Sequence, residues 1–148
     1  MHLVTADLYE DPELAVLAPR LKDCDAAVRR IAVLGLADLD GEAHVPLLVA
    51  ALDDAAAPVR AEAARALQAF ETPAAVAGLA RLLSDPDAQV RDAAARSLSE
   101  LKQSASAAQL IPYIGSGDSF VRAAALRGVR ELRLPASFAP AQGALQDA

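Results

Sequence analysis

The chain has 148 residues, of which 54% are hydrophobic and 3% aromatic, and its formal net charge at pH 7 is −6. This length is typical of one domain, and the acidic surface argues against general affinity for nucleic acid or anionic membranes, since both select basic surfaces. The single cysteine, Cys24, excludes an internal disulfide and indicates a reducing compartment.

Residues 1–10 have neither the basic stretch nor the apolar stretch of a signal peptide. No apolar run along the chain is long enough to span a bilayer. We therefore expect a cytoplasmic protein. Leu8 lies 31 residues before the apolar Leu39, in the repeat described next, so residues 1–10 are interpreted as a partial N-terminal cap.

The pair Val-Arg recurs every 31 residues, at Val28-Arg29, Val59-Arg60, Val90-Arg91 and Val121-Arg122. A fixed period of this length indicates stacked supersecondary units. Apolar residues at steps of four, four and three follow each valine and predict the second helix of a two-helix unit. Two columns on this helix hold small residues, which indicates close helix packing: Ala32, Ala63, Ala94 and Ala125, then Gly35, Ala66, Ser97 and Gly128.

The first helix of each unit carries its own apolar stripe. The stripes are Leu14, Leu17 and Leu21; Val45, Leu48 and Leu52; Val76, Leu79 and Leu83; and Ala107, Leu110 and Ile114. We predict helix breaks near 23–25, 40–43, 53–57, 71–73, 84–86, 102–105 and 115–118. The repeats are then 11–41, 42–72, 73–103 and 104–134, with a C-terminal capping helix over 135–148. A piece of a longer solenoid would give the same pattern.

The predicted fold class is therefore all-α: a right-handed α-solenoid of stacked antiparallel helix pairs, with about four repeats and partial terminal caps. These residues resemble the HEAT-repeat superfamily, and specifically the short 31-residue HEAT-like repeats of the phycobilisome (bilin) lyase type. The resemblance covers roughly residues 11–134. It is specific for the fold and weak for function, because this family serves many unrelated roles.

The resemblance also implies an Asp/Arg ladder, in which the Asp caps the second helix and the Arg ties to a neighbouring unit. The matching residues are Asp23 and Arg29, Asp54 and Arg60, and Asp85 and Arg91, with Arg122 at the fourth position. The fourth unit departs from the pattern, since Ser116 replaces the Asp. An anion-binding row is the alternative reading of the four arginines, but a half-buried Arg needs a paired acid, which favours the ladder.

No pattern of residues predicts catalysis, a cofactor or a metal, so we expect a protein that is not an enzyme. The two histidines, His2 and His44, are far apart, and Glu42 and His44 lie on different sides of a helix. We expect His44 to be a surface residue in the first turn of its helix. Cys24 lies between two aspartates, which disfavour its thiolate, and we expect an unreactive surface thiol.

A row of arginines is the strongest candidate for a binding site. Arg65, Arg96 and Arg127 occupy one position in consecutive units, on the side that is usually concave in such arrays, and Arg130 extends the row. Solvated ion pairs with Glu100 and Glu131 are the alternative interpretation of Arg96 and Arg127. Arg is a common interface anchor, so we expect an acidic or mixed protein segment to dock there.

The favoured function is a non-catalytic interaction module or scaffold that binds a protein partner of unknown identity on its concave face. An accessory subunit of an enzyme complex, similar to the bilin lyase subunits, is an alternative. A HEAT-like DNA glycosylase is a remote alternative, because such enzymes need a cationic face and aromatic residues. We expect no nucleic acid, no membrane, and a monomer or weak self-association.

Overall fold

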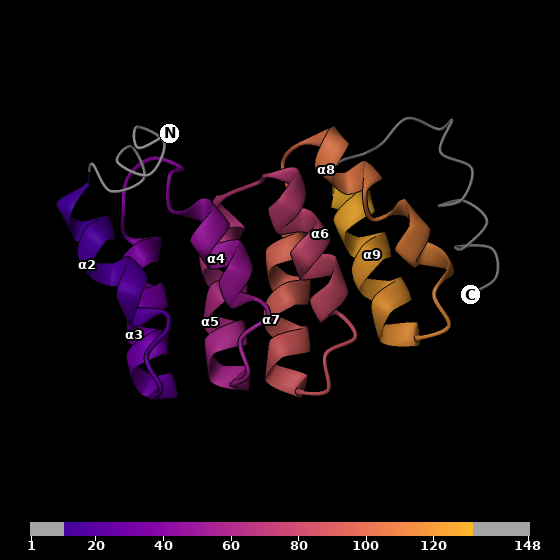
Figure 1. Cartoon of the computed structure of the whole chain (residues 1–148). Coiled ribbons are helices and arrows are strands. Elements are labelled where there is room, and N and C mark those ends of the chain that lie inside the picture. Colours follow the sequence, from indigo (N-terminus) through magenta and orange to yellow (C-terminus); the bar gives the residue numbers. More distant parts are fainter. Residues whose placement is uncertain (1–10, 132–148) are drawn as a thin grey trace, which may run out of the picture.

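The structure is a computed structural model that describes residues 11–131, with side chains as far as Val129. Every element in this range is helical (Figure 1). The elements are α2 (Pro12–Arg20), α3 (Ala26–Ala37), α4 (Val45–Ala51), α5 (Ala57–Ala66), α6 (Pro73–Leu82), α7 (Ala88–Ser99), α8 (Ser104–Ala108) and α9 (Ser119–Glu131), with 3₁₀ helices η1 (Leu67–Ala69) and η2 (Ile111–Gly115). The predicted caps at 1–10 and 135–148 lie outside the described residues.

The helices are arranged as four consecutive units in two layers. The second helices α3, α5, α7 and α9 pack against one another in sequence order, and α2, α4, α6 and α8 each pack on the second helix of their own unit (Figure 1). Each unit therefore contacts mainly its neighbours, as expected of a solenoid. The prediction of an all-α solenoid is confirmed, and each predicted helix break lies within or beside an observed one.

Short polar side chains set the starts of the helices. The carboxylates of Asp25 and Asp87 occupy the N-cap positions of α3 and α7 and accept hydrogen bonds from first-turn backbone N–H groups. Thr72 caps α6 through its hydroxyl oxygen, which accepts from the backbone N–H of Ala75, and Pro73 follows at the first helical position. These caps satisfy N–H groups that have no partner within the helix.

The first helix of the fourth unit is interrupted. The sequence pattern predicts one amphipathic helix over this segment, but α8 ends at Ala108 and the chain continues as η2. Pro112 explains the interruption, because proline has no N–H to donate and its ring disfavours helical backbone at Ile111. The apolar stripe still packs inward, since Leu110 and Ile114 are both buried.

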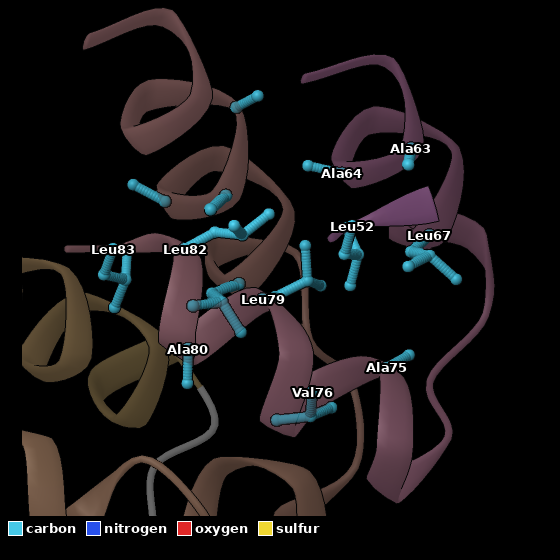
Figure 2. Packing of buried hydrophobic residues seen from close by; sticks show 14 of the residues in the cluster. Leu52, Ala63, Ala64, Leu67, Ala75, Val76, Leu79, Ala80, Leu82 and Leu83 are labelled. Atoms are coloured by element: carbon cyan, nitrogen blue, oxygen red, sulfur yellow. The ribbon is translucent and has the colours of Figure 1, made fainter. Parts of the chain in front are cut away.

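Leucine and alanine side chains fill the space between the two layers (Figure 2). All four members of the predicted alanine column are fully buried: Ala32, Ala63, Ala94 and Ala125. Two members of the second small column leave little room for a larger side chain. A Cβ atom added to Gly128 would lie 3.1 Å from the carbonyl oxygen of Leu98, and one added to Gly35 would lie 2.9 Å from a methyl carbon of Leu17.

Candidate partner-binding surface

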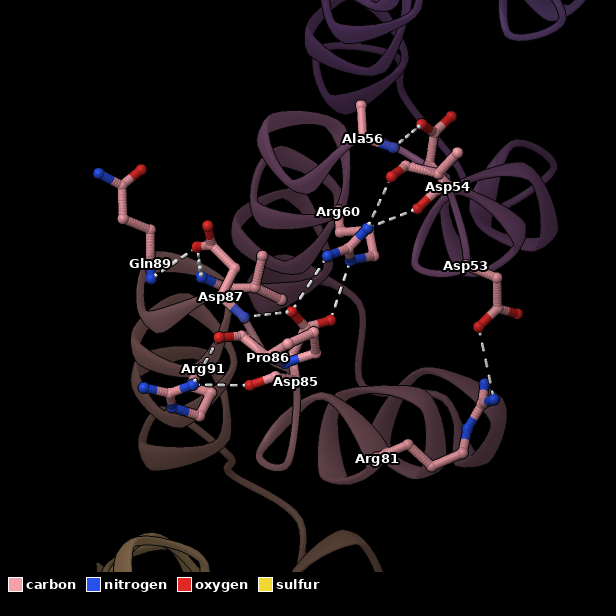
Figure 3. Close-up of polar contacts among 12 residues, drawn as sticks. Asp53, Asp54, Ala56, Arg60, Arg81, Asp85, Pro86, Asp87, Gln89 and Arg91 are labelled. Carbon is pink, nitrogen blue, oxygen red and sulfur yellow. Dashed lines mark hydrogen bonds and ion pairs between the residues drawn. The ribbon is translucent and has the colours of Figure 1, made fainter.

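Two of the ladder arginines pair with an aspartate of the following unit. Arg29 donates from Nε to Oδ2 of Asp54 at 2.9 Å and from Nη2 to Oδ1 at 3.0 Å. Arg60 repeats this fork on Asp85, with distances of 2.9 and 3.1 Å (Figure 3). Such two-point pairs are among the stronger polar contacts in proteins, and here each joins consecutive units.

Each of these arginines also holds the turn of its own unit. The third donor position, Nη1, donates to the backbone carbonyl oxygen of Asp23 in the case of Arg29, and of Asp54 in the case of Arg60, both at 2.8 Å. The aspartate side chains close the turns. Asp54 accepts from the backbone N–H of Ala56 at 2.8 Å. The ladder aspartates thus lie two residues before the N-cap position, whereas the family resemblance implied that they are the caps themselves.

The ladder shifts the pKa of its members. Burial by itself raises the pKa of Asp54, but the hydrogen bonds from Arg29 and Ala56 and the nearby positive charges outweigh burial and hold the pKa below its ordinary value. The same balance lowers the pKa of Asp85, with Arg60 as donor. The hydrogen bond to Asp54 raises the pKa of Arg29. These carboxylates therefore stay ionised at neutral pH.

The third arginine of the ladder has no such acid. Arg91 donates from Nη1 to the carbonyl oxygens of Asp85 at 2.7 Å and Pro86 at 3.1 Å, as Arg60 does to its own turn. No ion pair joins it to any residue between 11 and 129. Ser116 stands where Asp54 and Asp85 stand in the earlier units, and its carbonyl oxygen accepts from Arg122 at 2.8 Å.

A groove runs between the second helices of the second and third units. It has a volume of about 400 Å³, and we call it the α5–α7 groove, lined by Arg65, Gln68, Gln89, Asp92, Ala93, Arg96 and Ser97. Its wall is mostly polar side chains on the solvent side of the two helices. Two of the predicted partner-binding residues, Arg65 and Arg96, are therefore brought to one groove.

The charges in this groove are more fully paired than the sequence suggested. Arg65 lies 3.3 Å from Glu62, whose carboxylate also accepts from Arg30 of the preceding unit at 3.1 Å. Arg96 Nε lies 3.1 Å from Oδ2 of Asp92, so its acid is not Glu100, the partner named in the alternative interpretation. Both acids lie in the helical turn that precedes their arginine, whereas the i,i+4 pattern points to the following turn.

Both groove arginines remain accessible in spite of these pairs. The side chains of Arg65 and Arg96 are 51% and 79% exposed. Arg127 is exposed on α9 but does not line the groove. The side chains of Arg130 and Glu131 lie outside the described side chains.

His44 contradicts its predicted surface position. It is 1% exposed, stands at the N-cap position of α4, and packs edge-on against Phe70 with ring centroids 5.0 Å apart. Its Nε2 atom has no hydrogen-bond partner in the described part of the chain. Burial lowers the pKa of His44, and the charge of Asp11 opposes this only in part. This burial is not apparent from the residue pattern, because His44 precedes the apolar stripe rather than belonging to it.

Cys24 is exposed, as expected of a surface thiol. Between residues 11 and 131, no three His, Cys, Asp or Glu side chains come together as a possible metal site. In the same range, no helix combines the length and the apolar character needed to cross a membrane.

The family model of HEAT repeats matches residues 14–99 and again 76–148. No curated protein sequence matches the chain.

Among solved structures, the complex of CpcE and CpcF of phycocyanin lyase from Nostoc sp. PCC7120 is similar, with a TM-score of 0.58 and 27% identity over 86% of this chain and 67% of that one. An engineered protein is similar with a TM-score of 0.57 and 26% identity, over 82% of this chain and 62% of that one. The chain thus spans about two thirds of the length of the matched chain in each structure.

Proposed function

The chain belongs to the HEAT-repeat family, and on that premise we propose that it is a non-catalytic module that binds a protein partner along its second helices. The observation that carries the proposal is the α5–α7 groove, where two exposed arginines from consecutive units face one hollow. A groove built on packed helices fixes the backbone positions of its lining residues, which reduces the entropy lost on binding.

The groove favours a partner segment of mixed polarity with acidic residues. Arg65 and Arg96 each share their charge with one acid, so a second carboxylate can still approach the exposed side of the guanidinium. Gln68 and Gln89 offer amide donors and acceptors beside them. On α3, Ile31 and Leu34 are 62% and 44% exposed, and they give apolar surface toward the N-terminal end.

A second candidate is an accessory subunit of an enzyme complex. It is favoured by the likeness to the complex of CpcE and CpcF of phycocyanin lyase. In that case the partner would be an enzyme subunit, and activity would appear only when both proteins are combined.

Nucleic acid is a poor fit to the groove. The residues that line it include no aromatic side chain on which a base would stack, and the chain as a whole is acidic. A DNA mobility-shift assay at low salt tests this point, and we expect no shift.

Affinity purification followed by mass spectrometry tests the proposed function. Wild-type protein is compared with a triple variant, Arg65→Ala, Arg96→Ala and Arg127→Ala, whose fold is checked by circular dichroism. We expect one or more proteins to be captured by the wild type and lost with the triple variant. Equal capture by a correctly folded triple variant would exclude the arginine row as the docking surface. Enzymatic activity in the captured pair, absent from either protein alone, would favour the accessory subunit.

A further inference from the structure

We propose that Arg91 is a binding site for a carboxylate, and that an Asp or Glu side chain of a protein partner supplies it. The site lies at the turns of the third and fourth units, not in the α5–α7 groove. In the two complete pairs, the equivalent position is occupied by an aspartate of the chain itself, Asp54 or Asp85.

Arg91 is anchored to its own turn in the same way as the two paired arginines. In the two complete pairs, Nη1 is fixed to the arginine's own turn while Nε and Nη2 reach the next unit. Arg91 makes the same Nη1 contacts to Asp85 and Pro86. Its Nε and Nη2 donors have no partner among the described residues. Two parallel N–H donors at a fixed spacing match the two oxygens of a carboxylate.

Ser116 explains why the place is open. Its hydroxyl oxygen accepts from the backbone N–H of Asp118 at 3.2 Å, as Asp85 accepts from the N–H of Asp87 at 2.9 Å. Serine therefore keeps the turn but has no carboxylate to offer to Arg91.

A hollow of about 740 Å³ lies at this position and gives an external group access to Arg91. Its lining includes Phe120, which is 37% exposed and offers apolar surface to the methylene groups of an incoming side chain. Its other lining residues include three acids, Asp85, Asp92 and Asp118.

Two of these acids are already paired, Asp85 with Arg60 and Asp92 with Arg96. Asp118 accepts from the backbone N–H of Phe120. Its counterpart in the third unit, Asp87, lies two residues from Asp85 and does not prevent that carboxylate from binding Arg60. An acid at this position is therefore compatible with a bound carboxylate.

The occupant is inferred from charge and shape together. A fork of this kind binds a planar carboxylate, and both equivalent places in the chain hold an aspartate. A side chain on a partner reaches the hollow from solvent, and its binding does not require the groove to be a docking surface.

Titration of the full chain with a small probe, followed by NMR of the arginine Nε–H signals, tests the site. The probe is N-acetyl-aspartate amide, its control is N-acetyl-asparagine amide, and sodium chloride keeps the ionic strength constant. The Arg91 signal is assigned by its loss in Arg91→Gln. We expect a saturable shift of this signal with the acid probe, none with the amide, and a smaller shift at Arg96.

A matched pair of variants separates this site from general attraction to a cation. Ser116→Asp supplies the missing acid from within the chain, so we expect it to abolish the response to the probe. Ser116→Asn has nearly the same shape without the charge and should keep the response. Ser116→Asp should also raise the melting temperature above that of Ser116→Asn, and this gain should disappear when Arg91→Gln is added.

Three results would overturn the proposal: no saturable shift at Arg91, a response of Ser116→Asp equal to that of the wild type, or inorganic phosphate acting at lower concentration than the acid probe. The last result would reassign the site to phosphate groups.

Discussion

The hydroxyl of Ser97 on α7 donates a 2.6 Å hydrogen bond to the backbone carbonyl oxygen of Ala64 on α5. Both residues are buried, at 2% and 0% exposure. We predict that Ser97→Ala lowers the free energy of unfolding by about 1 kcal/mol, through loss of this bond. Ser97→Val adds volume at a helix contact and should cost roughly 1–3 kcal/mol more. Urea unfolding followed by circular dichroism measures both. If Ser97→Val were as stable as the wild type, the contact between α5 and α7 would have space for the larger side chain, contrary to this prediction.

Arg60 and Arg91 allow the ladder pair to be weighed within one molecule. They make the same contacts to their own turns, but only Arg60 has an acid in the next unit. We predict that Arg60→Gln costs about 1–2 kcal/mol more than Arg91→Gln, because it leaves the buried Asp85 without its cation. Thermal unfolding of the two variants side by side gives the difference. Equal losses of stability in the two variants would mean that the Arg60–Asp85 ion pair adds nothing to the stability that packing of the units provides.

Burial of His44 predicts a loss of stability in mild acid. The folded chain holds the pKa of this residue below its ordinary value of 6.5, so as the pH falls the unfolded chain binds the proton first. The stability contributed by neutral His44 is therefore present above pH 6.5 and is lost progressively below it. Leucine at this position should remove that slope, and His2→Gln, which changes the only other histidine, should not. Melting temperatures between pH 7.5 and pH 5 check the prediction, and a slope unchanged in His44→Leu would contradict it.

Two glycines of one column should respond differently to alanine. A Cβ at Gly128 meets a backbone carbonyl oxygen, which cannot move without displacing α7, whereas a Cβ at Gly35 meets only the end of the flexible Leu17 side chain. Alanine gains roughly 1 kcal/mol over glycine inside a helix. We therefore predict that Gly35→Ala is neutral or stabilising and that Gly128→Ala is destabilising. Differential scanning calorimetry distinguishes them, and the opposite order would refute this packing argument.

Periodicity predicted the fold because every unit places apolar and small side chains at equivalent positions of its two helices. The alanine column and the stripes of the first helices were readable from spacing alone, and they are buried as expected, except that Leu17 and Leu21 in the first unit are only partly buried. The interruption at Pro112 was not anticipated, because an apolar stripe carries no information about a missing N–H donor. The burial of His44 was also missed, since it depends on Phe70, which lies 26 residues further along the chain.

The candidate site was only partly predictable. The 31-residue spacing identified Arg65 and Arg96 as equivalent positions, and both residues line the α5–α7 groove. It did not identify their acids, because Glu62 serves two arginines from different units and Asp92 precedes Arg96 on its helix. Side-chain direction decides such pairs, and a pattern of residue types does not contain it.

The ladder has a direction, since an arginine always reaches forward to the aspartate of the following unit. This limits how such a chain can lengthen by duplication. A second copy of the second or third unit, inserted beside the original, would bring both an acid for the arginine before it and an arginine for the acid after it. A second copy of the fourth unit would bring Ser116 instead and leave Arg122 facing no acid. Duplication that adds a new pair is thus confined to the units before residue 104.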